Sequence, residues 1–439
     1  MRKVHFSILG DKKMQNYSDD IKKMGKLAKE ASKVLRTLST ADKNQLLIAI
    51  KDELINAKAD ILSANSIDVA DARAGGLKEA MVERLSLTDQ RFNEMIQGLE
   101  EVALLSDPVG EVDAMWLNEA GLSIGQKRVP LGVIAMIYES RPNVTVDATA
   151  LCLKTGNAVI LKGGSDALTT NIALLKAIDA AIEKQGMPVG TVQLVKTPDR
   201  DFTKQLLSAR DAIDCVIPRG GAGLIQFVAE HSKVPMIETG TGNCHIYVDE
   251  HYSIEKSVEI ILNAKVQRPG ACNAVETVLI HNRIAPELLP TLLASLKASN
   301  VGVALCDKSW AIAEASNCDL SSAWHATEVD YQTEYLDFKL AIKVVDSLTE
   351  AVDHIDNYST GHSEAILTDC YEHAQKFLAS VDSSAVYVNA STRFTDGGQF
   401  GFGAEIGIST QKLHARGPMG LKALTTIKYI VYGTGQIRK

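Results

Sequence analysis

The first hundred residues place apolar and polar side chains at the spacing of amphipathic helices. In the first predicted helix, the apolar positions that share one face are Leu27, Ala31, Val34, Leu35 and Leu38. Thr40 has the residue type that favours a helix N-cap, and a second helical pattern follows it. We therefore expect an all-helical opening from Ile21 to about Leu105, preceded by a mobile N-terminal arm over residues 1–20.

The pattern changes to the two-residue period of strands at Ala114. Two β-type runs flank a turn that contains Gly121, which is typical of a β-hairpin. Another strand-like run, Thr425–Tyr432, lies near the C-terminus. The sequence leaves open whether this run adds an edge to the hairpin or to a partner subunit.

Short β-branched runs alternate with helical stretches from Val133 onward. The first block of strand candidates is Val133–Tyr138, Ala158–Lys162, Val192–Val195, Cys215–Pro218 and Pro235–Glu238. The second block is Val275–His281, Val301–Leu305, Leu340–Val345, Ala365–Leu367 and Ala385–Asn389. Strands separated by helices predict parallel sheets, so we expect the α/β class with two parallel α/β units.

Composition narrows the class of function. The 439 residues exceed what one hydrophobic core usually serves, so two or three domains are expected. The net charge of −8 argues against nucleic acid as a partner, because phosphate backbones are bound by clustered Lys and Arg. Seven scattered cysteines without paired spacing predict a reducing compartment and no metal site. We expect a cytoplasmic protein, because no run approaches the ~20 apolar residues of a membrane span and no signal peptide is recognisable.

Two predicted strand-to-helix turns combine glycines with a cation. They are Lys162-Gly163-Gly164-Ser165 and Arg219-Gly220-Gly221. Glycine lets the backbone approach a ligand, and the free N–H groups of a helix start favour an anion, so both turns are candidates for binding cofactor phosphates. Ordinary tight turns are the alternative. The chain has no Gly-x-x-x-x-Gly-Lys-Ser/Thr motif, which argues against a P-loop hydrolase.

One cysteine differs from the other six in its surroundings. Cys272 lies in Gln267-Arg-Pro-Gly-Ala-Cys-Asn273, a run of small and polar residues between a helical stretch and a strand. Buried packing explains most of the others. An exposed loop, the neighbouring Arg268 and helix-end N–H groups favour a thiolate, so Cys272 is the candidate nucleophile.

Longer stretches carry a resemblance to a known family. They are Tyr138-Glu-Ser-Arg-Pro-Asn143, Leu161-Lys-Gly-Gly-Ser165, Ile217-Pro-Arg-Gly-Gly221, Glu238-Thr-Gly-Thr-Gly-Asn-Cys-His245, the run around Cys272 and Ala390-Ser-Thr-Arg-Phe-Thr-Asp-Gly-Gly398. Through them the chain resembles the γ-glutamyl phosphate reductase family of the aldehyde dehydrogenase superfamily, over roughly Met24 to the end. The resemblance implies NADPH-dependent reduction of γ-glutamyl 5-phosphate to glutamate 5-semialdehyde and phosphate, through a thioester on Cys272, in proline biosynthesis.

The resemblance also implies an aldehyde-dehydrogenase-like architecture. Its expected parts are an NADP-binding domain of modified Rossmann type (residues 21–112 and 130–260), a catalytic domain (261–420) and an oligomerisation element made of the hairpin and the C-terminal strand (113–129 and 421–439). A homo-oligomer, a dimer or larger, is implied. A separate glutamate 5-kinase is expected to supply the acyl phosphate, because the chain is too short to include one.

Catalytic roles follow from the same resemblance. Cys272 is the nucleophile, and Asn143 is an oxyanion donor together with the Cys272 backbone N–H, with helix capping as the alternative for Asn143. Glu238 precedes Cys272 at the interval typical of the superfamily. In oxidising relatives that Glu activates water, which here would destroy the thioester, so a positioning or proton-shuttling role and a purely structural role are both open for Glu238.

Binding roles are implied as well. Lys162 is expected to reach the adenosine ribose or its 2′-phosphate, and Glu334 to hold the nicotinamide ribose, with an exposed Glu as the alternative for Glu334. Ser165 is neutral where NAD-preferring relatives often carry a Glu, which favours NADPH. The substrate-binding candidates, each of which could instead be a surface or salt-bridging residue, are Arg141, Arg268, Arg393 and Asp396. Two rival functions are a hydrolytic semialdehyde dehydrogenase and a catalytically inactive scaffold.

Overall fold

The computed structural model describes residues 15–438 and divides them into two compact units. Unit 1 comprises the described residues up to Ile96, Leu131–Val216 and Phe227–Met236. Unit 2 comprises Gln97–Pro130, Ile217–Gln226 and the rest of the described chain from Ile237. None of the helices in residues 15–438 combines the length and the apolar character that crossing a membrane requires.

The described chain opens with helices, as the hydrophobic spacing predicts. They are α1 (Ser18–Leu35), α2 (Thr40–Asn56), α3 (Lys58–Ala74), α4 (Glu79–Leu85) and α5 (Asp89–Leu104). Most of the expected mobile arm lies outside the described residues, and its last three positions already belong to α1. The N-cap of α2 is Ser39 and not Thr40, because Ser39 exchanges hydrogen bonds with Asp42 in a capping box.

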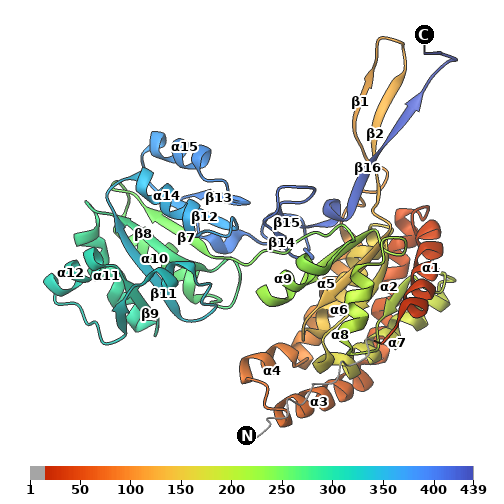
Figure 1. Cartoon of the computed structure of the whole chain (residues 1–439), viewed down its shortest axis with the longest axis horizontal. Coiled ribbons are helices and arrows are strands. Elements are labelled where there is room, and N and C mark those ends of the chain that lie inside the picture. The colour runs from red at the N-terminus through yellow and green to blue at the C-terminus, as the bar shows by residue number, and fades with distance from the viewer. Residues whose placement is uncertain (1–14, 439) are drawn as a thin grey trace, which may run out of the picture. The chain divides into compact units, whose positions relative to one another are not determined.

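A four-stranded parallel sheet forms the centre of unit 1, in the order β5-β4-β3-β6. Figure 1 shows the helices of this unit around it. The strands of the sheet are β3 (Val133–Tyr138), β4 (Ala158–Lys162), β5 (Val192–Leu194) and β6 (Cys215–Arg219), and the chain passes into unit 2 within β6, after Val216. The connecting helices are α6 (Pro142–Lys154), η1 (Ser165–Ala167), α7 (Leu168–Lys184), α8 (Arg200–Leu207) and α9 (Ala222–His231). All residues of β3 and β4 are buried, as expected for strands covered on both faces.

The expected strand at Pro235–Glu238 is wrong. The segment makes only an isolated parallel bridge between Met236 and Val216. Pro235 has no N–H to donate, and the N–H of Glu238 donates to the side chain of Gln411 at 3.0 Å. The ladder therefore stops after one bridge.

A seven-stranded sheet forms the centre of unit 2, and all its pairings are parallel. Its spatial order is β10 (Ala323–His325), β9 (Gly302–Leu305), β11 (Lys339–Val345), β8 (Val275–His281), β7 (Cys244–Val248), β12 (Ser363–Leu367) and β13 (Ala385–Val388). The helices are α10 (Ile254–Val266), α11 (Ala285–Ala298), α12 (Asp307–Ala315), α13 (Glu328–Gln332), α14 (Leu348–Tyr358) and α15 (Tyr371–Ser380). Buried aliphatic side chains of these helices and strands form its core.

The second sheet begins earlier than the sequence suggests. β7 has no counterpart among the expected strands, although it pairs with both β8 and β12 near the middle of the sheet. The expected boundary at residue 261 falls inside α10. Short remaining elements of unit 2 are η2 (Thr392–Phe394), β14 (Ile408–Ser409), β15 (Gly417–Pro418) and η3 (Leu421–Leu424).

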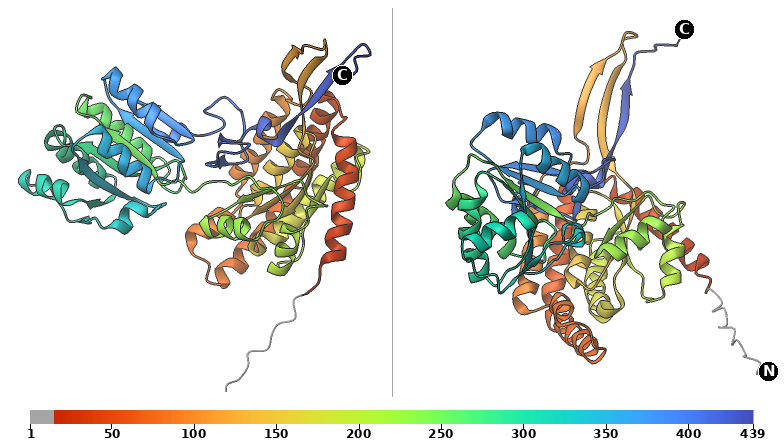
Figure 2. Two further views of the ribbon diagram at one scale, coloured as in Figure 1. Left: turned by 45° about the horizontal axis from the view of Figure 1, so that its top comes forward. Right: turned by 60° about the vertical axis from the view of Figure 1, so that its left-hand side comes forward.

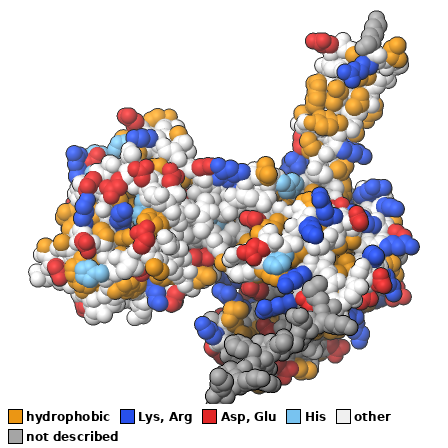
Figure 3. All heavy atoms as spheres, in the orientation of Figure 1, with side chains coloured by type: hydrophobic (Ala, Val, Ile, Leu, Met, Phe, Trp, Pro, Cys, Tyr) orange, Lys and Arg blue, Asp and Glu red, His pale blue; other side chains and the backbone are white. Residues whose placement is uncertain are grey.

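A three-stranded antiparallel sheet unites the hairpin with the C-terminal strand. β1 (Val112–Leu117) pairs with β2 (Ser123–Pro130), and β16 (Thr425–Tyr432) pairs with the other edge of β2 along its whole length. Both views in Figure 2 show the blue C-terminal strand alongside the orange hairpin. Of the two alternatives for the C-terminal strand, the hairpin and a partner subunit, the structure shows pairing with the hairpin of the same chain. Apolar side chains are exposed along this sheet (Figure 3).

Candidate active site

The amino-terminal edge of the seven-stranded sheet gathers the groups around Cys272. Because the strands are parallel, segments that precede different strands meet at this edge. Cys272 precedes β8, Gly242 precedes β7, and His362 precedes β12. This edge is opposite to the carboxyl edge at which open α/β sheets usually bind their ligands.

Hydrogen bonds at both ends fix the loop 267–273, which we call the nucleophile loop. The side-chain amide of Asn273 donates to the backbone carbonyls of Arg393 at 3.3 Å and Thr395 at 2.9 Å. The guanidinium of Arg393 donates to Gln267 Oε1 at 2.9 Å and also to Asn273 Oδ1. Arg393 therefore links the start of the loop to its end.

A close backbone approach supports the nucleophile loop from a second side. The thiol of Cys244 donates to the carbonyl oxygen of Cys272 at 3.2 Å. A Cβ atom on Gly242 would lie 1.4 Å from the same oxygen, so only glycine fits at that position. The segment before β7 is thus shaped to receive the backbone of the nucleophile.

Burial and three nearby charges set the pKa of the Cys272 thiol. The side chain is only partly exposed, and burial raises its pKa above the ordinary value. The guanidinium of Arg219 lowers this pKa, whereas the carboxylates of Glu405 and Glu334 raise it. The net effect is a raised pKa, so the expected thiolate-favouring setting is wrong. Arg268 is exposed. Burial lowers the pKa of Arg393, and the charge of Arg268 lowers it further.

Three glutamates of unit 2 differ in their hydrogen bonds. Glu334 Oε1 accepts the N–H of Gly242 at 2.7 Å, and burial raises the pKa of Glu334. Glu405 Oε2 accepts the N–H of Gly397 at 2.8 Å, and burial raises its pKa too. Glu238 is partly buried next to the Gln411 side chain that binds its backbone N–H.

The remaining substrate-binding candidates occupy different settings. Asp396 Oδ1 accepts the backbone N–H groups of Gly398 at 2.9 Å and Gln399 at 3.2 Å, so this carboxylate stabilises its own turn. Arg141 belongs to unit 1, where it is the N-cap residue of α6 with an extended backbone. The structure thus brings Arg268 and Arg393 together, and places Asp396 on the same segment as Arg393.

The first glycine turn follows β4 at the carboxyl edge of the unit 1 sheet. Lys162 is buried, its ammonium donates to the carbonyl of Gly163 at 3.0 Å, and burial lowers its pKa. A Cβ atom on Gly163 would lie 2.4 Å from Asn171 Nδ2. Ser165 begins the helical turn that leads into α7. The carboxylate of Asp166 comes next and accepts the hydroxyls of Ser140 at 2.9 Å and Ser165 at 3.3 Å.

The second glycine turn joins β6 to α9. Arg219 ends β6, and the carbonyl of Gly221 accepts the N–H groups of Leu224 at 3.0 Å and Ile225 at 3.2 Å as the helix begins. The prediction that glycines stand where helices begin is confirmed at both turns. The cation of this turn lies close enough to the nucleophile to act on the pKa of Cys272, an effect that spacing along the chain could not reveal.

Asn143 lies in the first turn of α6, in unit 1. Its side chain is exposed, and Nδ2 donates to Asp147 Oδ2 at 2.9 Å. Because Arg141 is the N-cap residue, Asn143 does not cap the helix. The amide is held within one helical turn and belongs to a different unit from Cys272.

Comparisons with known proteins agree over nearly the whole chain. The model of the aldehyde dehydrogenase family matches residues 11–325. The γ-glutamyl phosphate reductase of Caldanaerobacter subterraneus is 54% identical over 96% of this chain and 100% of that protein. The chain belongs to the γ-glutamyl phosphate reductases of the aldehyde dehydrogenase family. It is therefore an oxidoreductase of that family.

Solved structures support this family and its fold. The crystal structure of γ-glutamyl phosphate reductase from Thermotoga maritima has a TM-score of 0.92 at 50% identity, and the match covers 96% of this chain and 100% of that one. An acetylating aldehyde dehydrogenase from Geobacillus thermoglucosidasius has a TM-score of 0.68 at 16% identity over 96% of this chain and 98% of that one, a likeness of fold alone. The predicted aldehyde-dehydrogenase-like α/β fold is confirmed.

Several residues at the edge around Cys272 were not singled out from the sequence. Glu405 lies inside the glycine-rich run Phe400–Gly407, in which no local pattern marks it as a site residue. His362 is fully buried, its Nδ1 lies 2.8 Å from Ser363 Oγ and 3.7 Å from Cys244 Sγ, and burial lowers its pKa to about 4. The parallel pairing of β12 with β7 brings His362 to this edge, and Glu405 comes from a segment far along the chain, so neither could be inferred from spacing.

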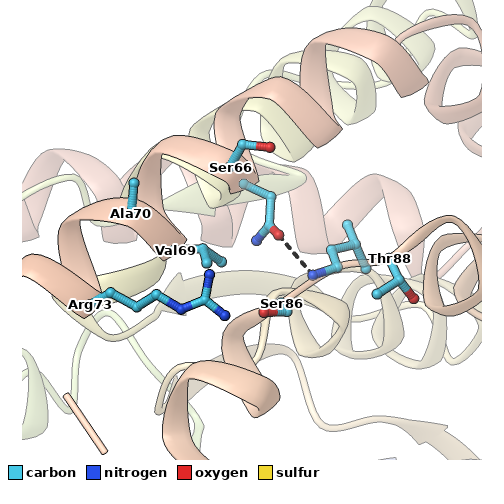
Figure 4. A pocket seen from close by; sticks show the side chains of 8 residues that line it. Ser66, Val69, Ala70, Arg73, Ser86 and Thr88 are labelled. Atoms are coloured by element: carbon cyan, nitrogen blue, oxygen red, sulfur yellow. Dashed lines mark hydrogen bonds between the residues drawn. The ribbon is translucent and has the colours of Figure 1, made fainter. Parts of the chain in front are cut away.

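A hollow of about 320 Å³ belongs to unit 1. Figure 4 shows it between α3, which contributes Ser66 and Arg73, and the segment from Ser86 to Thr88. The dashed line marks the N–H of Leu87 donating to Asn65 Oδ1 at 2.7 Å. The lining residues include no nucleophilic cysteine and no histidine, so we assign this hollow no catalytic role.

Proposed function

We propose that this chain reduces γ-glutamyl 5-phosphate to glutamate 5-semialdehyde with NADPH, through a thioester on Cys272, as a step of proline biosynthesis. The observation that carries the proposal is the braced nucleophile loop, which holds a partly exposed Cys272 beside the charge of Arg219. The identity of the substrate is proposed from relatives named γ-glutamyl phosphate reductase, one of which is 54% identical.

The chemistry begins with the Cys272 thiolate. Its sulfur attacks the acyl carbon, the bond from that carbon to the phosphate oxygen breaks, and inorganic phosphate leaves with the bonding electrons. NADPH, when bound, supplies the hydride that reduces the thioester. The resulting hemithioacetal anion collapses, which releases the semialdehyde and regenerates the thiolate. Both tetrahedral stages place negative charge on the carbonyl oxygen, for which the Cys272 N–H and the Asn143 amide are the proposed donors.

The carboxylates around Cys272 must not activate water. A base that delivered hydroxide to the thioester would convert the energised acyl group into glutamate and waste it. We therefore assign Glu238 a positioning or proton-shuttling role. Glu334 and Glu405 each accept a backbone N–H, from Gly242 and Gly397, which supports a structural or binding role for both and not activation of water.

The residues of the first glycine turn fit a dinucleotide phosphate. Gly163 and Gly164 lie at the carboxyl edge of the sheet, where a side chain on Gly163 would clash with Asn171, and Lys162 adds a cation there. Gly220, Gly221 and Arg219 are proposed as a second contact with the cofactor. The neutral Ser165 supports NADPH over NADH, and Glu334 is proposed to hold the nicotinamide ribose.

The substrate carries a phosphate, a carboxylate and an ammonium group. We propose that Arg268, Arg393 and Arg141 meet the anionic groups and that Asp396 meets the ammonium, because a guanidinium can bind oxyanions with two donors. A separate glutamate 5-kinase is proposed to supply the acyl phosphate. We also propose a homo-oligomer that works in the cytoplasm.

One assay separates the proposal from its rivals. The protein is incubated with pyrroline-5-carboxylate and NADP⁺, with and without inorganic phosphate, and NADPH formation is followed by absorbance. The proposal expects NADPH only with phosphate, and none from Cys272→Ala. Turnover without phosphate would identify a hydrolytic semialdehyde dehydrogenase. No turnover under either condition would favour an inactive scaffold.

A further inference from the structure

A buried ion pair closes the base of the nucleophile loop. Lys265 lies in the last turn of α10, just before the loop, and Glu276 lies at the start of β8, just after it. Lys265 Nζ is 2.5 Å from Glu276 Oε2, and both side chains are fully buried. The pair therefore joins α10 to β8, the two elements between which the loop lies.

The second oxygen of Glu276 extends this contact to another segment. Glu276 Oε1 accepts the N–H of Leu336 at 3.2 Å, and Leu336 follows closely after Glu334. Glu334 in turn accepts the N–H of Gly242, the residue whose Cα faces the carbonyl oxygen of Cys272. The contacts form a closed ring from Glu276 through Leu336, Glu334 and Gly242 back to the nucleophile loop.

Stability alone does not account for such a pair. Removing two charges from water costs about as much as their attraction returns, so apolar side chains of similar volume often serve a core equally well. Lys265 also lies 6.0 Å from the centre of the Tyr335 ring, within the segment that carries Glu334. The pair thus contacts residues 335 and 336 and lies at the two ends of the nucleophile loop.

We propose that Lys265 and Glu276 are positioning residues that hold the nucleophile loop and Glu334 in one fixed arrangement. Cys272 and the cofactor-binding carboxylate then keep their mutual geometry through both chemical steps. The inference rests on the proposed function in one respect, since Glu334 is taken as the residue that holds the cofactor ribose.

The test uses the full chain with the double substitution Lys265→Met and Glu276→Leu, which removes both charges together. The expected result is a folded protein whose kcat falls by up to roughly a hundredfold, because small misplacements of reacting groups are that costly. The Kd for NADP⁺ rises about tenfold as Glu334 loses its anchor. Iodoacetamide labels Cys272 faster than in the wild type, because a released loop is less buried.

A matched control separates positioning from folding. Asp249 is a buried carboxylate that follows β7 at the opposite edge of the same sheet, where His373 binds it at 2.6 Å. Asp249→Asn is expected to lower the melting temperature while it leaves the labelling rate of Cys272 and the affinity for NADP⁺ unchanged. Should the double variant fail to fold, Glu276→Gln keeps the size of the side chain and is expected to shift both readouts in the same directions.

The labelling rate and the NADP⁺ affinity need no acyl substrate, so they test the inference apart from the reaction. A folded variant with the labelling rate and NADP⁺ affinity of the wild type overturns it. A wild-type chain that binds no NADP⁺ overturns the proposed function and the role of Glu334. The labelling comparison then still decides whether the pair positions the nucleophile loop.

Discussion

The reactivity of Cys272 depends on charges that come from distant parts of the chain. Burial raises the pKa of the thiol, Arg219 lowers it, and Glu405 raises it further. Replacing the cation by Arg219→Met raises the pKa further, so the thiolate fraction at pH 7 falls and iodoacetamide labels Cys272 roughly three- to tenfold more slowly. Glu405→Gln shifts the pH profile of labelling in the opposite direction.

A second arginine of unit 2 provides the control for this prediction. Arg283 is largely exposed, pairs with Glu250, and follows β8 at the carboxyl edge, away from Cys272. Arg283→Met should leave the pH profile of labelling unchanged. A profile that moves equally in both arginine variants would contradict a specific effect of Arg219.

We propose that the first glycine turn sets the preference between NADPH and NADH. The neutral Ser165 favours the 2′-phosphate, but the exposed carboxylate of Asp166 follows it directly. Asp166→Asn removes a negative charge near the proposed phosphate position. The ratio of kcat/KM for NADPH over NADH is therefore expected to rise roughly three- to tenfold. Glu183→Gln, at the far end of α7, is the control and should leave the ratio unchanged.

At the scale of elements, the same substitution of glycine by alanine should have opposite effects on stability in two helices. A Cβ on Gly25 in α1 would lie 2.2 Å from the Cβ of Ala212, whereas a Cβ on Gly98 in α5 would meet nothing within 4 Å. Gly25→Ala should destabilise the fold by about 1–3 kcal/mol through overpacking. Gly98→Ala should stabilise it by about 0.5–1 kcal/mol, because alanine favours helix. Urea unfolding followed by circular dichroism measures both, and equal signs would contradict the packing of α1.

Some helices and strands can be predicted from the sequence and others cannot. The helical opening, the hairpin and most strands follow from local periodicity, because each repeats a pattern over its own length. β7 was not predicted, because its five residues contain the pair Cys244-His245. This pair is buried because β8 and β12 flank the strand. Pro235–Glu238 has strand-like composition but lacks a partner for its donors.

The same limit applies to the candidate site. Cys272 stands out because its own loop is unusual, and Glu334 and Arg393 follow from the resemblance. The bonds of Arg393 to Gln267 and Asn273 join segments far apart in sequence, so they could not be inferred from spacing. The raised pKa of Cys272 is likewise a property of the assembled edge and not of the loop.

At the scale of the whole molecule, the three-stranded sheet exposes a row of large apolar side chains. Ile427, Tyr429 and Val431 alternate onto one face of β16 and are 40%, 59% and 54% exposed. Trp116 shares that face, with its ring 6.3 Å from that of Tyr429 in an edge-on arrangement. Exposed apolar side chains grouped in this way mark association surfaces, and the same sheet of a second copy is the proposed partner.

The double substitution Tyr429→Glu and Val431→Glu tests this face directly. Two carboxylates buried between copies would be unpaired, so we expect the variant to sediment as a monomer while the wild type sediments as a dimer or larger. Lys428 is exposed and points to the opposite face, so Lys428→Glu is the matched control and should retain the wild-type mass. A wild-type protein that stays monomeric at the concentrations of the activity assay would remove the sheet from the assembly. A monomeric but fully active double variant would instead show that the site in unit 2 works without a second copy.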